Sequence, residues 1–289
     1  MGTRAVVLSG GGVVGIAWET GIAKGLLDGG VDVAAADLIV GTSAGSVVGS
    51  QLACGRSPTE LLDAQLAPPE EAGPGLEIDP TALAGLYKKF VGVTELTDAL
   101  RVEIGELALA AKTPSEERWL ASFERSIGPG DWPEQRLVVT AVDTATAAFA
   151  TWDRTSGVGL ARAVASSCAV PGLFPPVTIN GRRYMDGGMR TIANVDVAQG
   201  YDAVLVIAFI GGRPGDASGF FGRQLDEQIK ELRAAGSTVD LISPDAAAIE
   251  AFGMNPMDPG RRVPGAEAGV RQGSEISRQL SATWSRTAA

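Results

Sequence analysis

The sequence predicts an α/β protein of three layers, in which a mainly parallel central sheet lies between helices. Short apolar runs that are typical of buried strands alternate with longer segments whose apolar residues recur every three or four positions. Near the N-terminus, glycine-rich turns twice connect such a strand to the helix that follows it. Alternation of this kind favours strands that are joined by crossover helices and therefore lie parallel in one sheet.

The composition is that of a globular protein, and we expect residues 1–289 to form one domain. Hydrophobic residues make up 45% of the chain and charged residues 20%. The net charge of −10 argues against a nucleic-acid partner, because DNA and RNA are polyanions. No uninterrupted apolar run approaches the roughly 20 residues of a membrane span, and no signal-peptide pattern is present. The sequence therefore favours a cytoplasmic protein with at most peripheral contact to a membrane; its oligomeric state stays open.

The first two strand-to-helix units are predicted from the first 54 residues. A buried strand at Arg4–Leu8 leads through a glycine cluster into a helix at Val14–Leu27. A second strand at residues 36–40 leads through a turn at residues 41–45 into a helix that ends near Cys54. We expect both turns to lie at the same edge of the sheet, because parallel strands end at a common edge.

Residues 57–135 are amphipathic and interrupted by proline-rich breaks, and we expect them to form a helical cap insertion. Within this region, the segment LYKKFVGV at residues 86–93 brings basic and aromatic residues together. It is our candidate for contact with a membrane surface, although most amphipathic helices only pack on a core.

The strand pattern returns after the cap. Strands are expected at residues 136–142 and 147–152, and a helix follows at residues 160–172. The dipeptide Asn180-Gly181 predicts a hairpin whose second strand delivers Asp186 into a Gly-Gly turn.

The remaining chain continues the alternation. A buried strand is expected within residues 201–212, a helix at 219–236, a last strand at 238–244 and C-terminal helices at about 262–285.

The chain contains no histidine, which restricts the chemistry it can perform. A Ser-His-Asp triad and any histidine metal ligand are excluded. The two cysteines, Cys54 and Cys168, match neither a zinc pattern nor a disulfide framework. We expect no metal and no organic cofactor.

The sequence GTSAG at residues 41–45 fits the G-x-S-x-G nucleophile elbow. In this motif Gly41 and Gly45 permit a strained turn that exposes the hydroxyl of Ser43 at a helix N-terminus. The helix dipole and the N–H of Ala44 would then stabilise negative charge on a bound acyl oxygen.

The glycine cluster before the first helix has two interpretations. Gly10, Gly12 and Gly15 satisfy G-x-G-x-x-G, the pattern of a nucleotide-binding loop. That interpretation lacks its acidic residue, because Asp37 stands at the start of the second strand and not at its end. The same glycines could instead supply further N–H donors to the oxyanion.

Without histidine, the base that activates Ser43 must come from another residue type. Ser46 stands where an S-x-x-K motif would have lysine, so a carboxylate is the best candidate. Asp186 is favoured because it ends a strand and is flanked by small glycines. Asp143, at the end of another strand, is the second choice.

Four motifs together resemble the patatin-like phospholipases. GGGVVG, GTSAG, ASSCAVPGLFPP and DGG occur in the order and approximate spacing of that family, from the first strand to about residue 210. The resemblance implies a patatin-like α/β/α fold and the hydrolysis of lipid carboxylic esters through an acyl-enzyme. Two alternatives remain: a nucleotide-binding module that uses the glycine loop, and a lipid-binding relative without catalytic activity.

The resemblance also implies roles for individual residues. Ser43 and Asp186 would form a catalytic dyad, with Gly10, Gly11 and Gly12 in the oxyanion loop. The family usually has a basic residue where this sequence has Val14, so no preference for anionic headgroups is expected. Ser166, Ser167 and Pro171 would shape the site and would not react.

Overall fold

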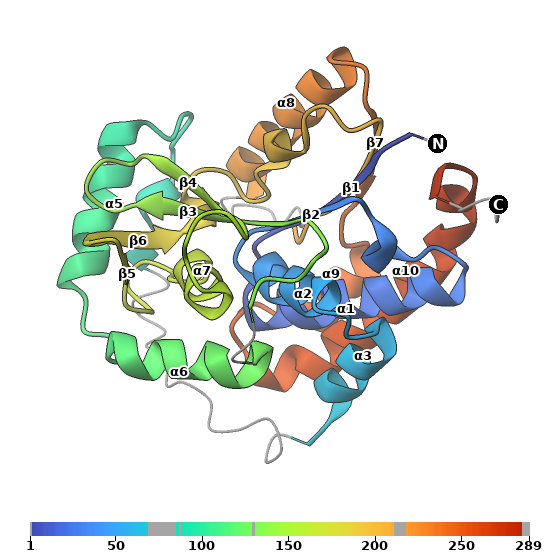
Figure 1. The fold of residues 1–289 in the computed structure, drawn as a ribbon, viewed down its shortest axis with the longest axis horizontal. Coiled ribbons are helices and arrows are strands. Elements are labelled where there is room, and N and C mark those ends of the chain that lie inside the picture. Colours follow the sequence, from blue (N-terminus) through green and yellow to red (C-terminus); the bar gives the residue numbers. More distant parts are fainter. Residues whose placement is uncertain (1, 69–84, 87, 129–130, 211–217, 285–289) are drawn as a thin grey trace.

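One eight-stranded sheet forms the centre of the described part of the chain. A computed structural model describes residues 2–68, 85–86, 88–128, 131–210 and 218–284. Its strands are β1 (Arg4–Leu8), β2 (Leu38–Gly41), β3 (Leu137–Asp143), β4 (Phe149–Trp152), β5 (Val177–Ile179), β6 (Arg182–Asp186), β7 (Ala203–Ile207) and β8 (Thr238–Ile242). The order is β5-β6-β3-β2-β1-β7-β8, and β4 pairs with β3 (Figure 1).

The sheet is parallel through its middle and antiparallel at one end. β3, β2, β1, β7 and β8 are parallel neighbours. β4 and β6 are both antiparallel to β3, and β5 is antiparallel to β6. The prediction of a mainly parallel sheet is confirmed. The antiparallel part consists of β4, which follows β3 in the chain, and of the hairpin of β5 and β6 that was predicted at Asn180-Gly181.

Helices cover both faces of this sheet. They are α1 (Gly12–Asp28), α2 (Ala44–Ala53), α3 (Pro58–Leu66), α5 (Asp98–Ala110), α6 (Glu116–Ile127), α7 (Leu160–Ser167), α8 (Ser218–Ala234), α9 (Ala246–Phe252) and α10 (Arg262–Trp284). Short 3-10 turns include η2 (Gly187–Met189) and η3 (Val195–Ala198).

Alternate side chains of β1 show how the three layers are held together. Val6 and Leu8 join a hydrophobic core with α1, α2, α7 and α10. Ala5 and Val7 point to the opposite face and pack with α8. Figure 1 shows α1, α2, α9 and α10 on one side of the sheet and α8 on the other. The three-layer prediction is confirmed, because β1 is buried on both faces as a central parallel strand should be.

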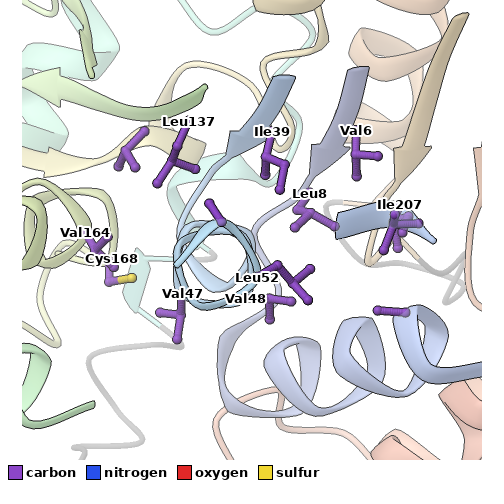
Figure 2. Close-up of a cluster of buried hydrophobic side chains, with 14 of the residues drawn as sticks. Val6, Leu8, Ile39, Val47, Val48, Leu52, Leu137, Val164, Cys168 and Ile207 are labelled. Carbon is purple, nitrogen blue, oxygen red and sulfur yellow. The ribbon is translucent and has the colours of Figure 1, made fainter. Parts of the chain in front are cut away.

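Helix α2 is the element that carries the predicted nucleophile, and it is anchored in the larger core. Val47, Val48 and Leu52 of α2 belong to the same buried cluster as Leu8 and Ile39 of the sheet (Figure 2). Burial of these side chains holds the start of α2 in a defined place above the strand ends.

Helices α1 and α10 pack unusually closely because glycines line their contact. A Cβ atom added at Gly21 or Gly25 of α1 would meet the backbone of α10 at Ala266 or Val270. Conversely, a Cβ added at Gly269 of α10 would meet the backbone of α1. Helix α10 is thereby fixed along the middle and C-terminal half of α1, and a Cβ added at its Gly265 would meet Val14 near the start of α1, just after the glycine loop.

The predicted helical insertion contains α3, α5 and α6. Helix α3 packs against α1 and α10, and α6 packs against α7. The prediction for residues 57–135 falls partly outside the described residues, at 69–84, 87 and 129–130. The candidate membrane segment at 86–93 includes one of these positions, Tyr87, and its Leu86 and Phe90 are buried. Those two side chains are therefore part of the core and not of a lipid-facing surface.

One helix end and one additional helix differ from the prediction. Helix α7 ends at Ser167, short of the predicted residue 172, because Pro171 disfavours helical conformation in the residue before it. The short helix α9 before α10 was not predicted. Among the described residues, no helix is long and apolar enough to cross a membrane.

Candidate active site

Ser43 lies at the sharp turn between β2 and α2, in the conformation expected of a nucleophile elbow. Its φ is 51° and its ψ is −117°, a strained backbone for a residue with a Cβ. A Cβ added at Gly41 would lie 2.5 Å from the Cα of Ser46, and one added at Gly45 would meet the carbonyl of Leu8. Both positions therefore require glycine if the turn is to close against β1.

The backbone of Ser43 is held by its neighbours, while its hydroxyl is not used for helix capping. The N–H of Ser43 donates to Ser167 Oγ at 2.8 Å. The carbonyl of Ser43 accepts from Ser46 Oγ at 2.7 Å and from Cys168 Sγ at 3.2 Å. Ser167 thus supports the elbow, in the shaping role implied for this segment, and it does so through the backbone N–H of Ser43 and not through the hydroxyl.

Asp186 meets the elbow because β2 and β6 run toward each other along one edge of β3. Gly41, the last residue of β2, pairs with Val139, and Asp186, the last residue of β6, pairs with Ala141. β4 pairs with β3 at both of these positions and so occupies the opposite edge. The two strand ends therefore face each other across Thr140.

The carboxyl group of Asp186 is buried and incompletely hydrogen-bonded. Its Oδ1 accepts from the N–H of Gly188 at 2.7 Å. Its Oδ2 is buried and has no hydrogen-bond partner of normal geometry within the described residues. Burial raises the pKa of Asp186 to about 7, against the lowering effects of the nearby Ser43 hydroxyl and the Gly188 N–H. A carboxylate with this pKa is a much stronger base than an exposed aspartate.

Asp143, the second candidate base, has a different role. Its Oδ1 accepts from the backbone N–H groups of Ala145 and Thr146 at 3.0 and 2.9 Å, and its Oδ2 accepts from Arg182 Nε at 2.6 Å. Burial opposes its ionisation, but the hydrogen bonds from Arg182 and Thr146 outweigh burial and lower its pKa. Asp143 is thus a turn-stabilising carboxylate paired with arginine.

The glycine loop lies directly beside the nucleophile. A Cβ added at Gly10 would be 3.5 Å from the Cβ of Ser43. The N–H of Gly10 donates to the carbonyl of Ile192 at 2.8 Å, so this donor is already engaged. Gly11 and Gly12 form the N-cap and first residue of α1, and no acceptor among the described residues takes their N–H groups. These two groups are the available donors of the loop.

Ala44 offers a third donor on the other side of the nucleophile. It is the first residue of α2, so its N–H has no acceptor within the helix, and none of the described residues supplies one. A Cβ added at Gly15 would lie 3.5 Å from the Cβ of Ala44, which places the starts of α1 and α2 together. Both helix dipoles therefore favour negative charge here.

A buried carboxyl group that no motif in the sequence indicates lies beside the residue before the glycine loop. Glu19 of α1 is fully buried, and its Oε1 accepts from the N–H of Ser9 at 3.1 Å. Ser9 Oγ in turn accepts from the N–H of Phe209 at 2.7 Å. Burial raises the pKa of Glu19 well above its usual value, despite the hydrogen bonds from Ser9. Only its place in a helix between apolar residues could have suggested this burial.

Two further predictions concern charge near the loop. The side chain of Val14 is fully buried, and a Cβ added at Gly265 of α10 would meet it. Position 14 therefore contributes to the core. Asp37 accepts from the N–H of Arg4 at 2.7 Å, at the beginning of β1 and β2 and thus at the sheet edge opposite Ser43. It cannot hold a ribose at the glycine loop, so the nucleotide-binding alternative loses support.

The chain is similar to known proteins at the level of a protein family and of the fold. Residues 6–199 match the family described as patatin-like phospholipase. No curated protein sequence matches the chain. Two solved structures are similar to this fold. VipD from Legionella pneumophila has 13% sequence identity and a TM-score of 0.47, over 96% of this chain and 67% of VipD. The type III effector protein ExoU has 15% identity and a TM-score of 0.45, over 96% of this chain and 53% of ExoU, about half its length.

Proposed function

Because the chain belongs to the patatin-like phospholipase family, whose members hydrolyse lipid esters, we propose that it cleaves carboxylic esters of lipids through an acyl-enzyme formed by a dyad of Ser43 and Asp186. The observation that carries the proposal is a strained serine turn that faces a buried carboxyl group. A chain without histidine needs such a carboxylate to accept the serine proton.

Acylation uses the ionised form of Asp186. Ser43 Oγ attacks the ester carbonyl carbon while its proton passes to Asp186, and the carbonyl oxygen becomes an oxyanion. The N–H groups of Ala44, Gly11 and Gly12 donate to that oxyanion. When the tetrahedral intermediate collapses, the bond to the alcohol breaks, and Asp186 returns the proton to the departing oxygen.

Deacylation repeats these steps with water as the nucleophile. Asp186 accepts a proton from water as the water oxygen attacks the acyl carbon. Collapse then breaks the bond to Ser43 Oγ, which recovers the proton, and the free carboxylic acid leaves. The reaction needs no metal ion or organic cofactor at any step.

The surroundings of the loop favour neutral substrates. Apolar side chains adjoin each glycine: Ile192 lies near Gly10, Phe209 near Gly11 and Met257 near Gly12. Position 14, where the family resemblance implies a basic residue, is the buried Val14. We therefore expect neutral lipid esters to be hydrolysed at least as well as anionic phospholipids. A strong preference for anionic headgroups in a matched lipid panel would contradict this part of the proposal.

A fluorophosphonate probe tests the proposal, because it reacts only with an activated serine. The wild-type protein should be labelled at Ser43, and Ser43→Ala should lose both labelling and ester hydrolysis. Ser50→Ala is the matched control, since Ser50 is another buried serine of α2 and only donates to the carbonyl of Val47 at 2.9 Å. Labelling at a different serine would disprove the dyad. No labelling of the wild type would favour a lipid-binding relative without catalytic activity.

A further inference from the structure

A fully buried asparagine joins the strand ends on which the proposed dyad stands. Asn194 lies between η2 and η3, with a left-handed backbone at φ 52°. Asparagine tolerates this conformation better than other residues with a side chain, although glycine would tolerate it best. The conformation alone therefore does not account for a large polar side chain at this buried position.

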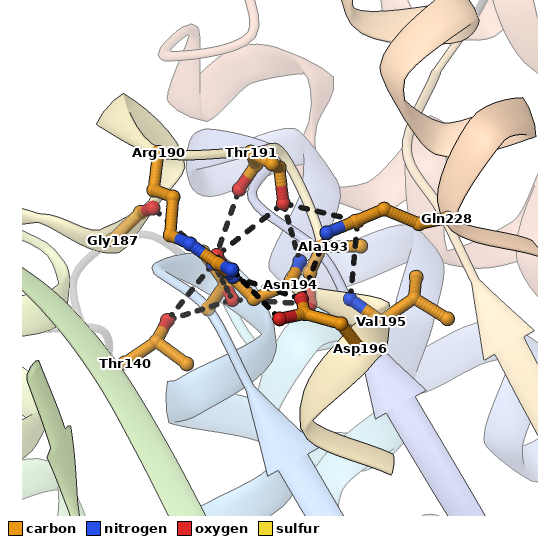
Figure 3. Close-up of polar contacts among 10 residues, drawn as sticks. Thr140, Gly187, Arg190, Thr191, Ala193, Asn194, Val195, Asp196 and Gln228 are labelled. Atoms are coloured by element: carbon orange, nitrogen blue, oxygen red, sulfur yellow. Dashed lines mark hydrogen bonds and ion pairs between the residues drawn. The ribbon is translucent and has the colours of Figure 1, made fainter. Parts of the chain in front are cut away.

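The amide nitrogen of Asn194 contacts both sides of the site. Its Nδ2 lies 3.1 Å from Thr42 Oγ1, in the residue before the nucleophile, and 3.2 Å from the carbonyl of Gly187, in the residue after Asp186. It also lies 3.3 Å from Thr140 Oγ1, on the β3 residue that separates the two strand ends. One side chain thus bridges the elbow and the turn that holds the carboxylate. Figure 3 shows Asn194 beside Gly187 and Thr140.

The other end of the amide is held by positive charge. Asn194 Oδ1 accepts from Arg190 Nη1 at 3.0 Å. Arg190 forms two hydrogen bonds to Asp196, at 2.8 and 2.7 Å, and its guanidinium lies 4.0 Å from the ring centre of Phe149. Gln228 of α8 donates to the same aspartate at 2.7 Å (Figure 3). Carbonyl acceptors on one side and a guanidinium donor on the other determine the orientation of the amide.

The same segment also reaches the glycine loop. Ile192, two residues before Asn194, accepts the hydrogen bond from the N–H of Gly10. The segment between η2 and η3 is therefore bonded to the elbow, to the Asp186 turn and to the glycine loop.

We propose that Asn194 is a positioning residue that sets the separation between Ser43 and Asp186 by bridging Thr42 and Gly187. This inference rests on the proposed function, because positioning matters only if the two residues react as a dyad. No backbone ladder connects β2 to β6, because each pairs with β3 and their ends only face each other. The separation of the two ends therefore depends on hydrogen bonds from other segments, and Asn194 contributes the side chain that contacts both. A proton transfer across that gap depends strongly on its length.

Substitution to glycine tests the role of the side chain without changing the preferred backbone. Asn194→Gly keeps the left-handed conformation and removes the bridge. Asn180→Gly is a matched control, because Asn180 has a φ of 51° but is exposed in the hairpin turn. We expect kcat and the fluorophosphonate rate to fall roughly 100-fold in Asn194→Gly, with KM changing much less. The control should stay within about twofold of the wild type. Equal effects of the two substitutions would overturn the proposal.

A double-variant cycle separates positioning from general damage. If Asn194 acts by positioning Asp186, adding Asn194→Gly to Asp186→Asn should cost no further fluorophosphonate reactivity. A second loss of similar size in that background would mean that Asn194 only maintains the fold.

A third measurement does not depend on catalysis. A protein that keeps Asp186 is compared with the same protein carrying Asp186→Asn. The difference between their free energies of unfolding, measured as a function of pH, reports the pKa of Asp186 in the folded state. Loss of the Asn194 amide leaves a polar space that water can enter beside the Asp186 turn. The pKa of Asp186 should then fall by roughly one pH unit or more in Asn194→Gly, and stay unchanged in Asn180→Gly. If the wild-type protein does not react with the fluorophosphonate probe, the proposed function fails. An unchanged pKa of Asp186 in Asn194→Gly would instead refute the positioning role of Asn194.

Discussion

At the scale of single residues, the pKa of Asp186 determines how the proposed enzyme responds to pH. Burial raises this pKa to about 7, and only the carboxylate can accept the proton of Ser43. We expect kcat to rise with pH through a single ionisation near 7 and then to level off. Initial rates on a neutral ester between pH 5 and 9 measure this profile. Full activity retained at pH 5 would mean that the base is not a buried carboxyl group with this pKa.

The same raised pKa has a cost in stability that Asp186→Asn should remove. The folded state binds the proton of Asp186 more tightly than the unfolded chain, whose aspartate has a pKa near 3.8. Stability is therefore lost as the pH rises from about 3.8 to about 7, by at most about 4 kcal/mol.

We expect Asp186→Asn to lose at least roughly 100-fold in kcat, because the general base is gone. It should nevertheless unfold at a higher urea concentration than the wild type at pH 8, while the two proteins should differ little at pH 4. Equal stability at pH 8 would show that Asp186 is not ionised at a cost in the folded protein.

At the scale of elements, the proposed active site depends on two helix starts that must lie side by side. Helix α2 is positioned by its apolar contacts with the sheet, and α1 by its close contact with α10. The glycine loop is short, so any displacement of α1 would move the N–H groups of Gly11 and Gly12 away from Ser43. Packing of α10 therefore contributes to the site without touching it.

Substitution of a contact glycine tests this dependence. In Gly21→Ala the new methyl group meets the carbonyl of Ala266, so α1 and α10 must separate. We expect a loss of roughly 1–3 kcal/mol in the free energy of unfolding, measured by urea denaturation.

Gly222→Ala in α8 is the matched control. Among the described residues, no atom outside the backbone of α8 itself lies within 4 Å of a Cβ added there, so alanine should stabilise the helix by roughly 0.5–1 kcal/mol. Destabilisation of both variants to the same degree would contradict the role assigned to the α1–α10 contact.

At the scale of the whole molecule, buried carboxyl groups shape the stability of the protein across pH. Glu19 and Asp186 both have raised pKa values caused by burial, so both favour folding at low pH. Asp143 and Asp245 have lowered pKa values, because hydrogen bonds from arginine and from backbone N–H groups outweigh their burial. The contribution of these two carboxylates to the stability of the folded protein is lost as the pH falls below the usual pKa range of aspartate. The two effects together place the maximum of stability in weakly acidic solution.

Glu19→Gln tests the effect of the raised pKa of Glu19 on the stability of the protein. Glutamine can keep the acceptor for Ser9 and cannot ionise, so the variant should be more stable than the wild type at pH 8 and similar to it near pH 4.5. Glu124→Gln is the control, since Glu124 is exposed on α6 and should leave the pH profile unchanged. Thermal unfolding at several pH values measures both. A parallel shift at every pH would contradict a buried, protonated Glu19.

Much of this arrangement can be predicted from local sequence. Strand and helix periodicity predicted the three layers, because burial on one or two faces leaves a repeat in the order of apolar residues. The G-x-S-x-G motif placed Ser43 in a strained turn, since the flanking glycines are required wherever a backbone closes this tightly. The absence of histidine left a carboxylate as the best candidate for the base. The dyad itself stays a prediction until Ser43 and Asp186 are tested.

Only the tertiary structure decided which groups share the buried space of the site. Pairing along one edge of β3 brought Asp186 opposite the elbow, and Arg182 engaged Asp143. The engaged N–H of Gly10, the carboxyl group of Glu19 and the bridge through Asn194 were likewise not visible in the sequence. A motif records the conformation of a few adjacent residues, whereas hydrogen-bond partners and burial depend on segments far apart in the chain. The physical environment that makes a carboxylate a base is therefore a property of the assembled fold.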